Sequence, residues 1–171
     1  CTECNGLGSK LEFDPSLIIP NRTLSLAQGA IAPWAKAHTR ESSVTRHVME
    51  ALARKYGFSI NTPIEKLDLS ITDVLIYGAA GQPLVVEYTN AAGRRRVYDV
   101  EFEGVIPNLR RRYEATESDF VRGEIERYMA RRVCPACESA RLCPEALAVH
   151  VGKKSIHEVT NLTIQAASLF F

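Results

Sequence analysis

Five cysteines are the residues of this chain whose type and spacing point most directly to a chemical role. Cys1 and Cys4 form one C-x-x-C pair, and Cys134 and Cys137 form a second, with a domain-sized stretch of sequence between them. A C-x-x-C knuckle turns two sulfurs towards one metal ion, and two knuckles supply the four thiolates of a tetrahedral zinc site. We therefore predict that these four cysteines bind one Zn²⁺ ion and that Cys143 is not a ligand.

The separation of the two knuckles is unusual, because a compact zinc ribbon places them about 15–20 residues apart. Closing a flexible loop of this length costs about 4 kcal/mol, whereas a structural zinc ion contributes about 10–16 kcal/mol in small peptides. One shared site is therefore reasonable, with Gly6 and Gly8 suited to the turn of the first knuckle and Pro135 to that of the second. Two other interpretations stay open: a C-x-x-C redox pair, and two half-sites completed by chain outside this sequence.

Two arginine triplets, Arg94–Arg96 and Arg110–Arg112, are a second chemical feature in a chain whose net charge is only +1. Arginine suits bidentate contact with phosphate. A strand turns alternate side chains to opposite faces and a helix spreads successive ones around its axis, so only part of each triplet can share a surface. We predict phosphate contacts from Arg95, Arg96, Arg110 and Arg111. The alternative is a solvated surface on which these arginines pair with Glu114, Glu117 or Asp119.

Motifs for several common catalytic sites are missing from this sequence. It contains no G-x-x-x-x-G-K-[ST] loop for nucleotide phosphates and no H-E-x-x-H zinc motif. The four histidines, at positions 38, 47, 150 and 157, show no metal-ligand spacing, and we interpret them as surface or core imidazoles. Taken by itself, the chain is predicted to be a binding or scaffold module without ATP hydrolysis.

Hydrophobic periodicity, caps and turn residues predict a mixture of helices and strands. The predicted helices are 41–56, 70–77 stopped by Gly78, 107–113, and one that opens at 116–119 and runs on towards Cys134. A hairpin is predicted from 84–89 and 95–102 with its loop at 90–93, and a strand at 146–151. The remaining predictions are an extended segment at 9–20, an ordered connector at 21–40, and helical turns at 155–161 and 163–171.

These elements predict an α+β fold in which a zinc-knuckle module carries a large insertion of helices and a β-hairpin. The predicted parts are residues 1–9 as the first half of the zinc module, 10–132 as the insertion, and 133–171 as the second half of the module with the start of a further domain. No apolar run approaches the length of a membrane span. Both ends of the sequence are expected to be cut from a longer chain.

A long collinear set of motifs resembles the UvrA family, the damage-recognising ATPases of bacterial nucleotide excision repair. The matching motifs include CTECNGLG at 1–8, FDP at 13–15, LSLAQGAIAPW at 24–34, FEGVIPNL at 102–109, CPAC at 134–137, PEALAV at 144–149 and IHEV at 156–159. This resemblance covers nearly the whole chain and is far more specific than one C-x-x-C-x-G-x-G segment. It departs from the family at Glu138-Ser139, where glycine is usual, and at Cys143, where a basic residue is usual.

The resemblance implies a zinc-bound insertion domain of the first signature domain that helps to contact double-stranded DNA. It also implies a cytoplasmic parent protein with ATP and Mg²⁺ sites, homodimer contacts and a UvrB-binding segment, all outside this sequence. Whether this chain has any enzymatic role of its own stays open. The alternatives are a stand-alone zinc-ribbon binding module and a UvrA paralogue that acts in drug self-resistance.

Overall fold

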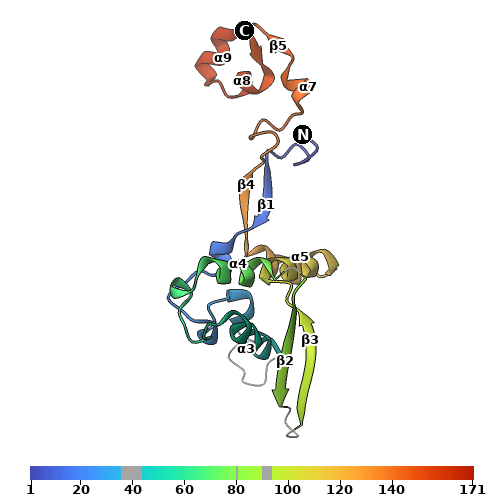
Figure 1. Cartoon of the computed structure of the whole chain (residues 1–171). Coiled ribbons are helices and arrows are strands. Elements are labelled where there is room, and N and C mark those ends of the chain that lie inside the picture. Colours follow the sequence, from blue (N-terminus) through green and yellow to red (C-terminus); the bar gives the residue numbers. More distant parts are fainter. Residues whose placement is uncertain (36–43, 80, 90–93) are drawn as a thin grey trace. The chain divides into compact units, whose positions relative to one another are not determined.

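The computed structural model of the chain describes residues 1–35, 44–79, 81–89 and 94–171 (Figure 1). These residues form two compact units: Cys1–Glu12 with Ala130–Phe171, and Phe13–Met129. We call them the cysteine unit and the insertion unit. Within the described residues, every helix is too short or too polar to traverse a lipid bilayer. The prediction of an α+β architecture is confirmed.

The insertion unit is built from short helices and one hairpin. Its elements are α1 (Pro15–Ile18), η1 (Leu26–Gln28), η2 (Ala32–Trp34), α3 (Val44–Tyr56), η3 (Ile64–Lys66), α4 (Leu69–Tyr77), β2 (Pro83–Thr89), β3 (Arg95–Glu101), α5 (Val105–Ala115) and α6 (Asp119–Glu126). Local caps explain several boundaries: Asp14 accepts a hydrogen bond from Ser16 N at the start of α1, and Ser118 accepts one from Val121 N in α6. Gly78 ends α4, as the sequence predicts.

The hairpin of β2 and β3 pairs in antiparallel register from Pro83 opposite Glu101 to Thr89 opposite Arg95. One face of β2 is buried, because the side chains of Leu84 and Val86 point into the core next to α3, which lies beside β2 in Figure 1. The other face is solvent-exposed, with 51% of Val85 accessible. The alternation follows from the period of two along a strand.

The core of the insertion unit lies among α3, α4, α5 and the base of the hairpin. Its fully buried side chains include Met49, Leu52, Leu75, Ile76, Val86, Val105 and Leu109. The backbone crosses itself closely there: a Cβ on Gly104 would lie 2.3 Å from Gly78 N, and Ala79 N donates to Phe102 O at 3.1 Å. Both glycines have φ near +90° and ψ near 170°, a conformation that is almost restricted to glycine.

The cysteine unit contains two small sheets and three short helices. Strand β1 (Ser9–Phe13) pairs with β4 (Met129–Val133), so the chain enters and leaves the insertion side by side. After the second knuckle come α7 (Pro144–Leu147), the paired strands β5 (His150–Val151) and β6 (Lys154–Ser155), α8 (Ile156–Thr160) and α9 (Ile164–Phe170). A capping box between Ser155 and Glu158 begins α8, and Thr163 caps α9.

Four predicted elements differ from the observed ones. The segment predicted to be extended at 9–20 contains helix α1, which Asp14 caps. The helix predicted to continue towards Cys134 ends at Glu126, because residues from Met129 pair with β1 instead. The strand predicted at 146–151 is reduced to His150–Val151, since Pro144 opens α7, which runs to Leu147. Helix α5 begins at Val105 rather than at Pro107. The predicted hairpin loop 90–93, the helix start 41–43 and His38 lie outside the described residues.

Candidate functional site

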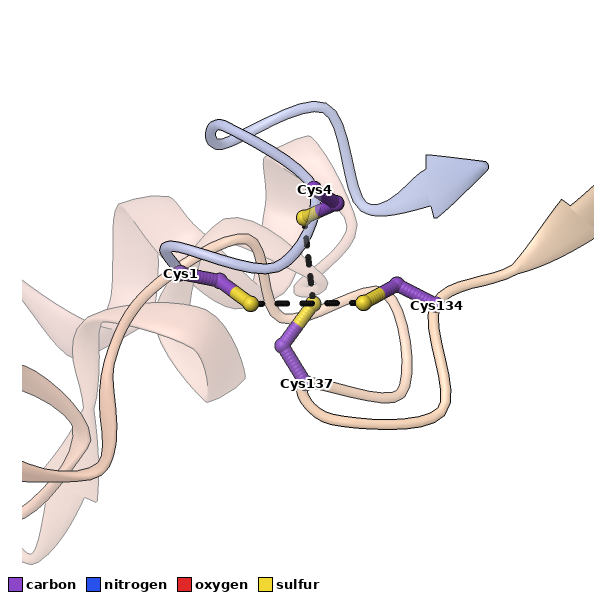
Figure 2. Close-up of side chains that lie close together, drawn as sticks. All are labelled: Cys1, Cys4, Cys134 and Cys137. Carbon is purple, nitrogen blue, oxygen red and sulfur yellow. Dashed lines mark hydrogen bonds between the residues drawn. The ribbon is translucent and has the colours of Figure 1, made fainter. Parts of the chain in front are cut away.

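The two C-x-x-C knuckles meet in the cysteine unit and form one cluster of sulfur atoms (Figure 2). The Sγ atoms of Cys1, Cys4, Cys134 and Cys137 all lie within 4.8 Å of one another. Two of the pairs that join different knuckles are Cys4 and Cys137, at 3.7 Å, and Cys1 and Cys134, at 3.9 Å. Cys4, Cys134 and Cys137 are buried and Cys1 is partly buried. All four cysteines singled out by their spacing therefore converge.

The cluster has the dimensions of a tetrahedral zinc site. Sulfurs bound to zinc at about 2.3 Å form a tetrahedron with edges of about 3.8 Å. The two measured cross-knuckle distances, 3.7 and 3.9 Å, lie on either side of this value. They are also far longer than a disulfide bond, and all five cysteines are free thiols. The four residues therefore fit a structural zinc ion in both donor chemistry and size.

Backbone hydrogen bonds fold each knuckle around its sulfurs. In the first, Gly6 N donates to Cys1 O at 3.1 Å and Gly8 N donates to Cys4 Sγ at 3.2 Å. Gly6 and Gly8 have φ values of 77° and 76°, as the sequence analysis expects of these turn glycines. Cys134 N donates to Gly8 O at 3.0 Å, which ties the two knuckles together.

The second knuckle uses non-glycine residues in the left-handed region. Glu138 has φ 46°, Ser139 has φ 73° and Arg141 has φ 68°. Glu138 N donates to Cys134 O at 2.8 Å and Ala140 N donates to Cys137 O at 2.7 Å, so the strained turn is held by regular hydrogen bonds. L-residues pay a steric cost in this region. The turn of the second knuckle is therefore strained at Glu138 and Ser139.

The electrostatics of the cluster favour partial ionisation even without a metal. Burial opposes ionisation of Cys4, but hydrogen bonds from Gly8 N, from Cys137 and Cys134, and from Gly6 N outweigh it and lower the pKa of this thiol to about 7. Burial raises the pKa of Cys137, against a hydrogen bond from Arg141 N. Zinc binds cysteines as thiolates, so its binding releases the protons of those thiols that are not yet ionised.

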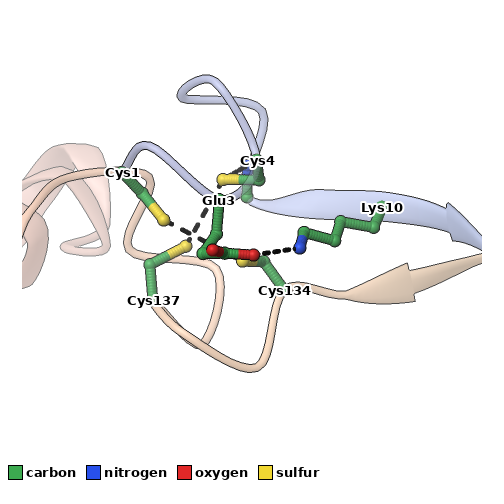
Figure 3. Close-up of polar contacts among 7 residues, drawn as sticks. Cys1, Glu3, Cys4, Lys10, Cys134 and Cys137 are labelled. Atoms are coloured by element: carbon green, nitrogen blue, oxygen red, sulfur yellow. Dashed lines mark hydrogen bonds and ion pairs between the residues drawn. The ribbon is translucent and has the colours of Figure 1, made fainter.

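One ion pair borders the cluster (Figure 3). Lys10, on β1, donates to the carboxylate of Glu3, which lies between Cys1 and Cys4 in sequence. This hydrogen bond raises the pKa of Lys10, and the charge of Cys134 contributes in the same direction. The ammonium group therefore sits where it attracts the negative charge of the thiolates. Cys143 is absent from the sulfur cluster and is the N-cap residue of α7, consistent with a role other than ligation.

The four arginines predicted to contact phosphate lie in the insertion unit. They differ in their surroundings, because two of them are paired with carboxylates. Arg95 begins β3 and pairs with Glu87 across the hairpin at 2.6 Å. Arg111, on α5, makes a two-point contact with Glu103, at 2.7 Å from Nη2 and 3.2 Å from Nε. Arg96 and Arg110 are exposed, and neither makes a hydrogen bond or ion pair with any residue in the described ranges.

The alternative partners considered from the sequence, Glu114, Glu117 and Asp119, do not pair with these arginines in the described structure. The observed partners, Glu103 and Glu87, are not among the predicted ones. Glu87 faces Val97 in the register, so its contact with Arg95 is a diagonal that a hairpin prediction could supply. Glu103 precedes α5, and its pairing with Arg111 requires the turn at Gly104, which has no simple sequence signal.

Comparison with known proteins places these features in a family. A sequence model of the UvrA DNA-binding domain matches residues 14–127. The UvrABC system protein A of Clostridium tetani is 44% identical over 165 residues, covering 96% of this chain and 17% of the relative. That of Halalkalibacterium halodurans is 42% identical over 171 residues, covering 100% of this chain and 18% of the relative.

Among solved structures, UvrA2 from Deinococcus radiodurans superposes with a TM-score of 0.67 at 20% identity, over 99% of this chain and 21% of that protein. This similarity supports the fold. The chain spans less than a fifth of the length of the two UvrABC system proteins A that it matches. On the match of the family model and the identity to these relatives along nearly its whole length, the chain belongs to the UvrA DNA-binding domain family.

Proposed function

We propose that this chain is the zinc-bound, DNA-contacting insertion domain of a UvrA protein that recognises damage in bacterial nucleotide excision repair. The convergence of four cysteine sulfurs from the two ends of the insertion carries the zinc part of the proposal. Zinc would be held by Cys1, Cys4, Cys134 and Cys137 and would contribute folding energy rather than catalysis, because four protein ligands leave no open coordination position.

Contact with double-stranded DNA is the second part of the proposal, supported by membership of the DNA-binding domain family. Arg95, Arg96, Arg110 and Arg111 are the proposed phosphate contacts. Phosphate contacts position a protein on DNA without reading bases, which suits recognition of lesions in any sequence. Arg95 and Arg111 are weaker candidates than Arg96 and Arg110, since they must leave Glu87 and Glu103 to bind phosphate.

The activity of the parent protein is proposed from the relatives. In this proposal ATP and Mg²⁺ bind elsewhere in the longer polypeptide, which dimerises and loads UvrB through other segments. Residues 1–9 and 133–171 would form the zinc module and 10–132 the insertion. We place the protein in the cytoplasm, where thiols stay reduced and available for zinc. A UvrA paralogue of drug self-resistance and a stand-alone zinc-ribbon module are the competing proposals.

Salt-dependent DNA binding by the zinc-loaded chain tests this function. The wild-type chain should bind damaged and undamaged duplexes with an affinity that falls steeply with salt. Replacing Arg96 and Arg110 with Gln should weaken both duplexes about equally and reduce the log–log salt slope by roughly 0.9 per lost phosphate contact. A zinc-loaded, folded wild-type chain that fails to bind either duplex would contradict the proposal. A chain that binds a protein ligand but no DNA would favour the competing proposal of a stand-alone zinc-ribbon module.

A further inference from the structure

A cavity of about 310 Å³ lies in the insertion unit where helix α3 meets the hairpin. Its lining comes from three residues of α3 and three of the hairpin: His47, Glu50, Arg54, Glu87, Tyr88 and Arg95. We call this site the α3–hairpin seam. Every residue that lines it belongs to one compact unit.

The walls of the seam are held by ring contacts. His47 and Tyr88 stack with ring centroids 5.3 Å apart and an angle of 22° between planes, and Tyr98 meets Tyr88 edge to face at 6.0 Å. On α3, the positions of His47, Glu50 and Arg54 follow the i, i+3, i+7 spacing that places side chains on one helix face. The seam is therefore a preformed feature with an aromatic floor.

The carboxylates of the seam are already neutralised by neighbours. Glu87 pairs with Arg95 at 2.6 Å. One oxygen of Glu50 accepts from Arg46 Nε at 3.1 Å, and the other lies 3.6 Å from His47 Nδ1. The acidic groups at this site therefore leave little negative charge to repel an anion.

Two guanidinium groups, that of Arg54 in the lining of the seam and that of Arg96 beside it, have no partner among the described residues. Arg54 is exposed and forms no hydrogen bond or ion pair with the described part of the chain. Arg96, directly opposite Tyr88 in the hairpin register, is in the same situation. Residues directly opposite on an antiparallel pair share a face with Cα atoms about 4.5–5.5 Å apart. The local charge is thus positive next to an aromatic surface.

We propose that the α3–hairpin seam binds the phosphodiester backbone of DNA, with Arg54 and Arg96 donating to phosphate oxygens. The stacked rings of His47 and Tyr88 pack against the adjoining deoxyribose. This inference rests on the DNA-binding function proposed above and assigns that function a surface. Arg54, which the sequence analysis did not single out, becomes a main contact, whereas Arg111 stays engaged with Glu103.

Single substitutions in the zinc-loaded chain test the seam, with binding to a 20-base-pair duplex followed by fluorescence anisotropy over a range of salt. Arg54→Gln and Arg96→Gln should each weaken binding about tenfold, as for loss of one charge-assisted hydrogen bond. Each should lower the log–log salt slope by about 0.9. Arg54→Lys should keep most of the slope, because it retains the charge; a merely structural role for Arg54 would not produce this difference.

Arg22→Gln is the matched control, because Arg22 is an exposed arginine of the same unit that lines a different cavity beside α1 and α4. It should leave the slope unchanged. An unchanged slope for Arg54→Gln in a folded, DNA-binding chain would overturn the seam and leave the general function standing. Equal losses for Arg22→Gln and Arg54→Gln would also overturn it. Absence of DNA binding by the wild-type chain would remove both proposals.

Discussion

The sulfur atoms of Cys4 and Cys137 lie 3.7 Å apart, although the whole insertion unit separates the two residues in sequence. Buried thiolates at this separation repel one another unless protons or a cation neutralise them. The paired strands β1 and β4 carry the two knuckles to the same place, and the hydrogen bond from Cys134 N to Gly8 O joins them. A single metal ion would therefore connect two segments that are remote in sequence.

Replacing Cys4 or Cys137 with Ser should greatly weaken the binding of zinc, because three thiolates and a hydroxyl bind the ion much more weakly than four thiolates. We expect one zinc ion per wild-type chain and markedly less in either variant, as measured by elemental analysis of purified protein. Cys143→Ser is the control and should keep one zinc ion. Loss of zinc from this control would show that the ligand assignment is wrong.

Replacing Gly104 with Ala should destabilise the insertion strongly. An added Cβ would lie 2.3 Å from Gly78 N and 2.5 Å from Tyr77 C, which is backbone that cannot rotate away. The combined strain and overlap should cost on the order of 3 kcal/mol or more of unfolding free energy, measured by urea denaturation.

Gly57→Ala is the matched control for this experiment. Gly57 also has positive φ, at +70°, but nothing lies within 4 Å of an added Cβ. It should cost only about 1 kcal/mol, the ordinary penalty of a left-handed non-glycine residue. Equal effects at Gly57 and Gly104 would mean that the close crossing of Gly78 and Gly104 does not exist in solution.

The pair of Glu103 and Arg111 should make stability depend on acidic pH. The hydrogen bond from Arg111, partly opposed by burial and assisted by Asn108, holds the pKa of Glu103 below its ordinary value of 4.5. Because the folded pKa is the lower one, the stabilisation is fully present above about pH 4.5 and is lost as pH falls through the folded pKa.

Glu103→Gln measures this contribution. The wild-type chain should be more stable than the variant at pH 7 by at most about 1 kcal/mol, since both partners are substantially exposed. Thermal melts at a series of pH values should show the two proteins converging as the pH falls below 4.5 and through the lowered pKa of Glu103. A stability difference that persists undiminished at pH 2 would argue against an ionic contribution from this pair.

Ser139→Gly should relax the second knuckle. Ser139 has φ 73°, and glycine adopts this conformation without steric cost. We expect a gain of up to about 1 kcal/mol in stability of the zinc-loaded chain, reduced by the greater freedom of glycine in the unfolded state. The neighbouring Ala140→Gly, at a residue outside the positive-φ set, should instead destabilise. A loss of stability in both variants would show that the strain at Ser139 is small.

Much of the local structure follows from neighbouring residues in the sequence. Gly78 stops α4, Ser155 and Glu158 begin α8, and the two β-branched and aromatic runs form the hairpin as predicted. The C-x-x-C spacing likewise identified the four cysteines that meet. These signals are readable because caps, turns and knuckles depend on groups only a few residues apart.

The tertiary structure decided the features that depend on residues far apart in sequence. Met129–Val133 became a strand rather than the end of a helix because β1, near the other end of the chain, supplies its hydrogen-bond partners. Arg111 is engaged by Glu103, whereas Arg54 and Arg96 have no partner in the part of the chain that the structure describes. The sequence shows where the arginines are, but only the packing of the chain decides which of them lies next to a carboxylate. The reason is that Coulomb attraction depends on distance in space and not on separation along the chain.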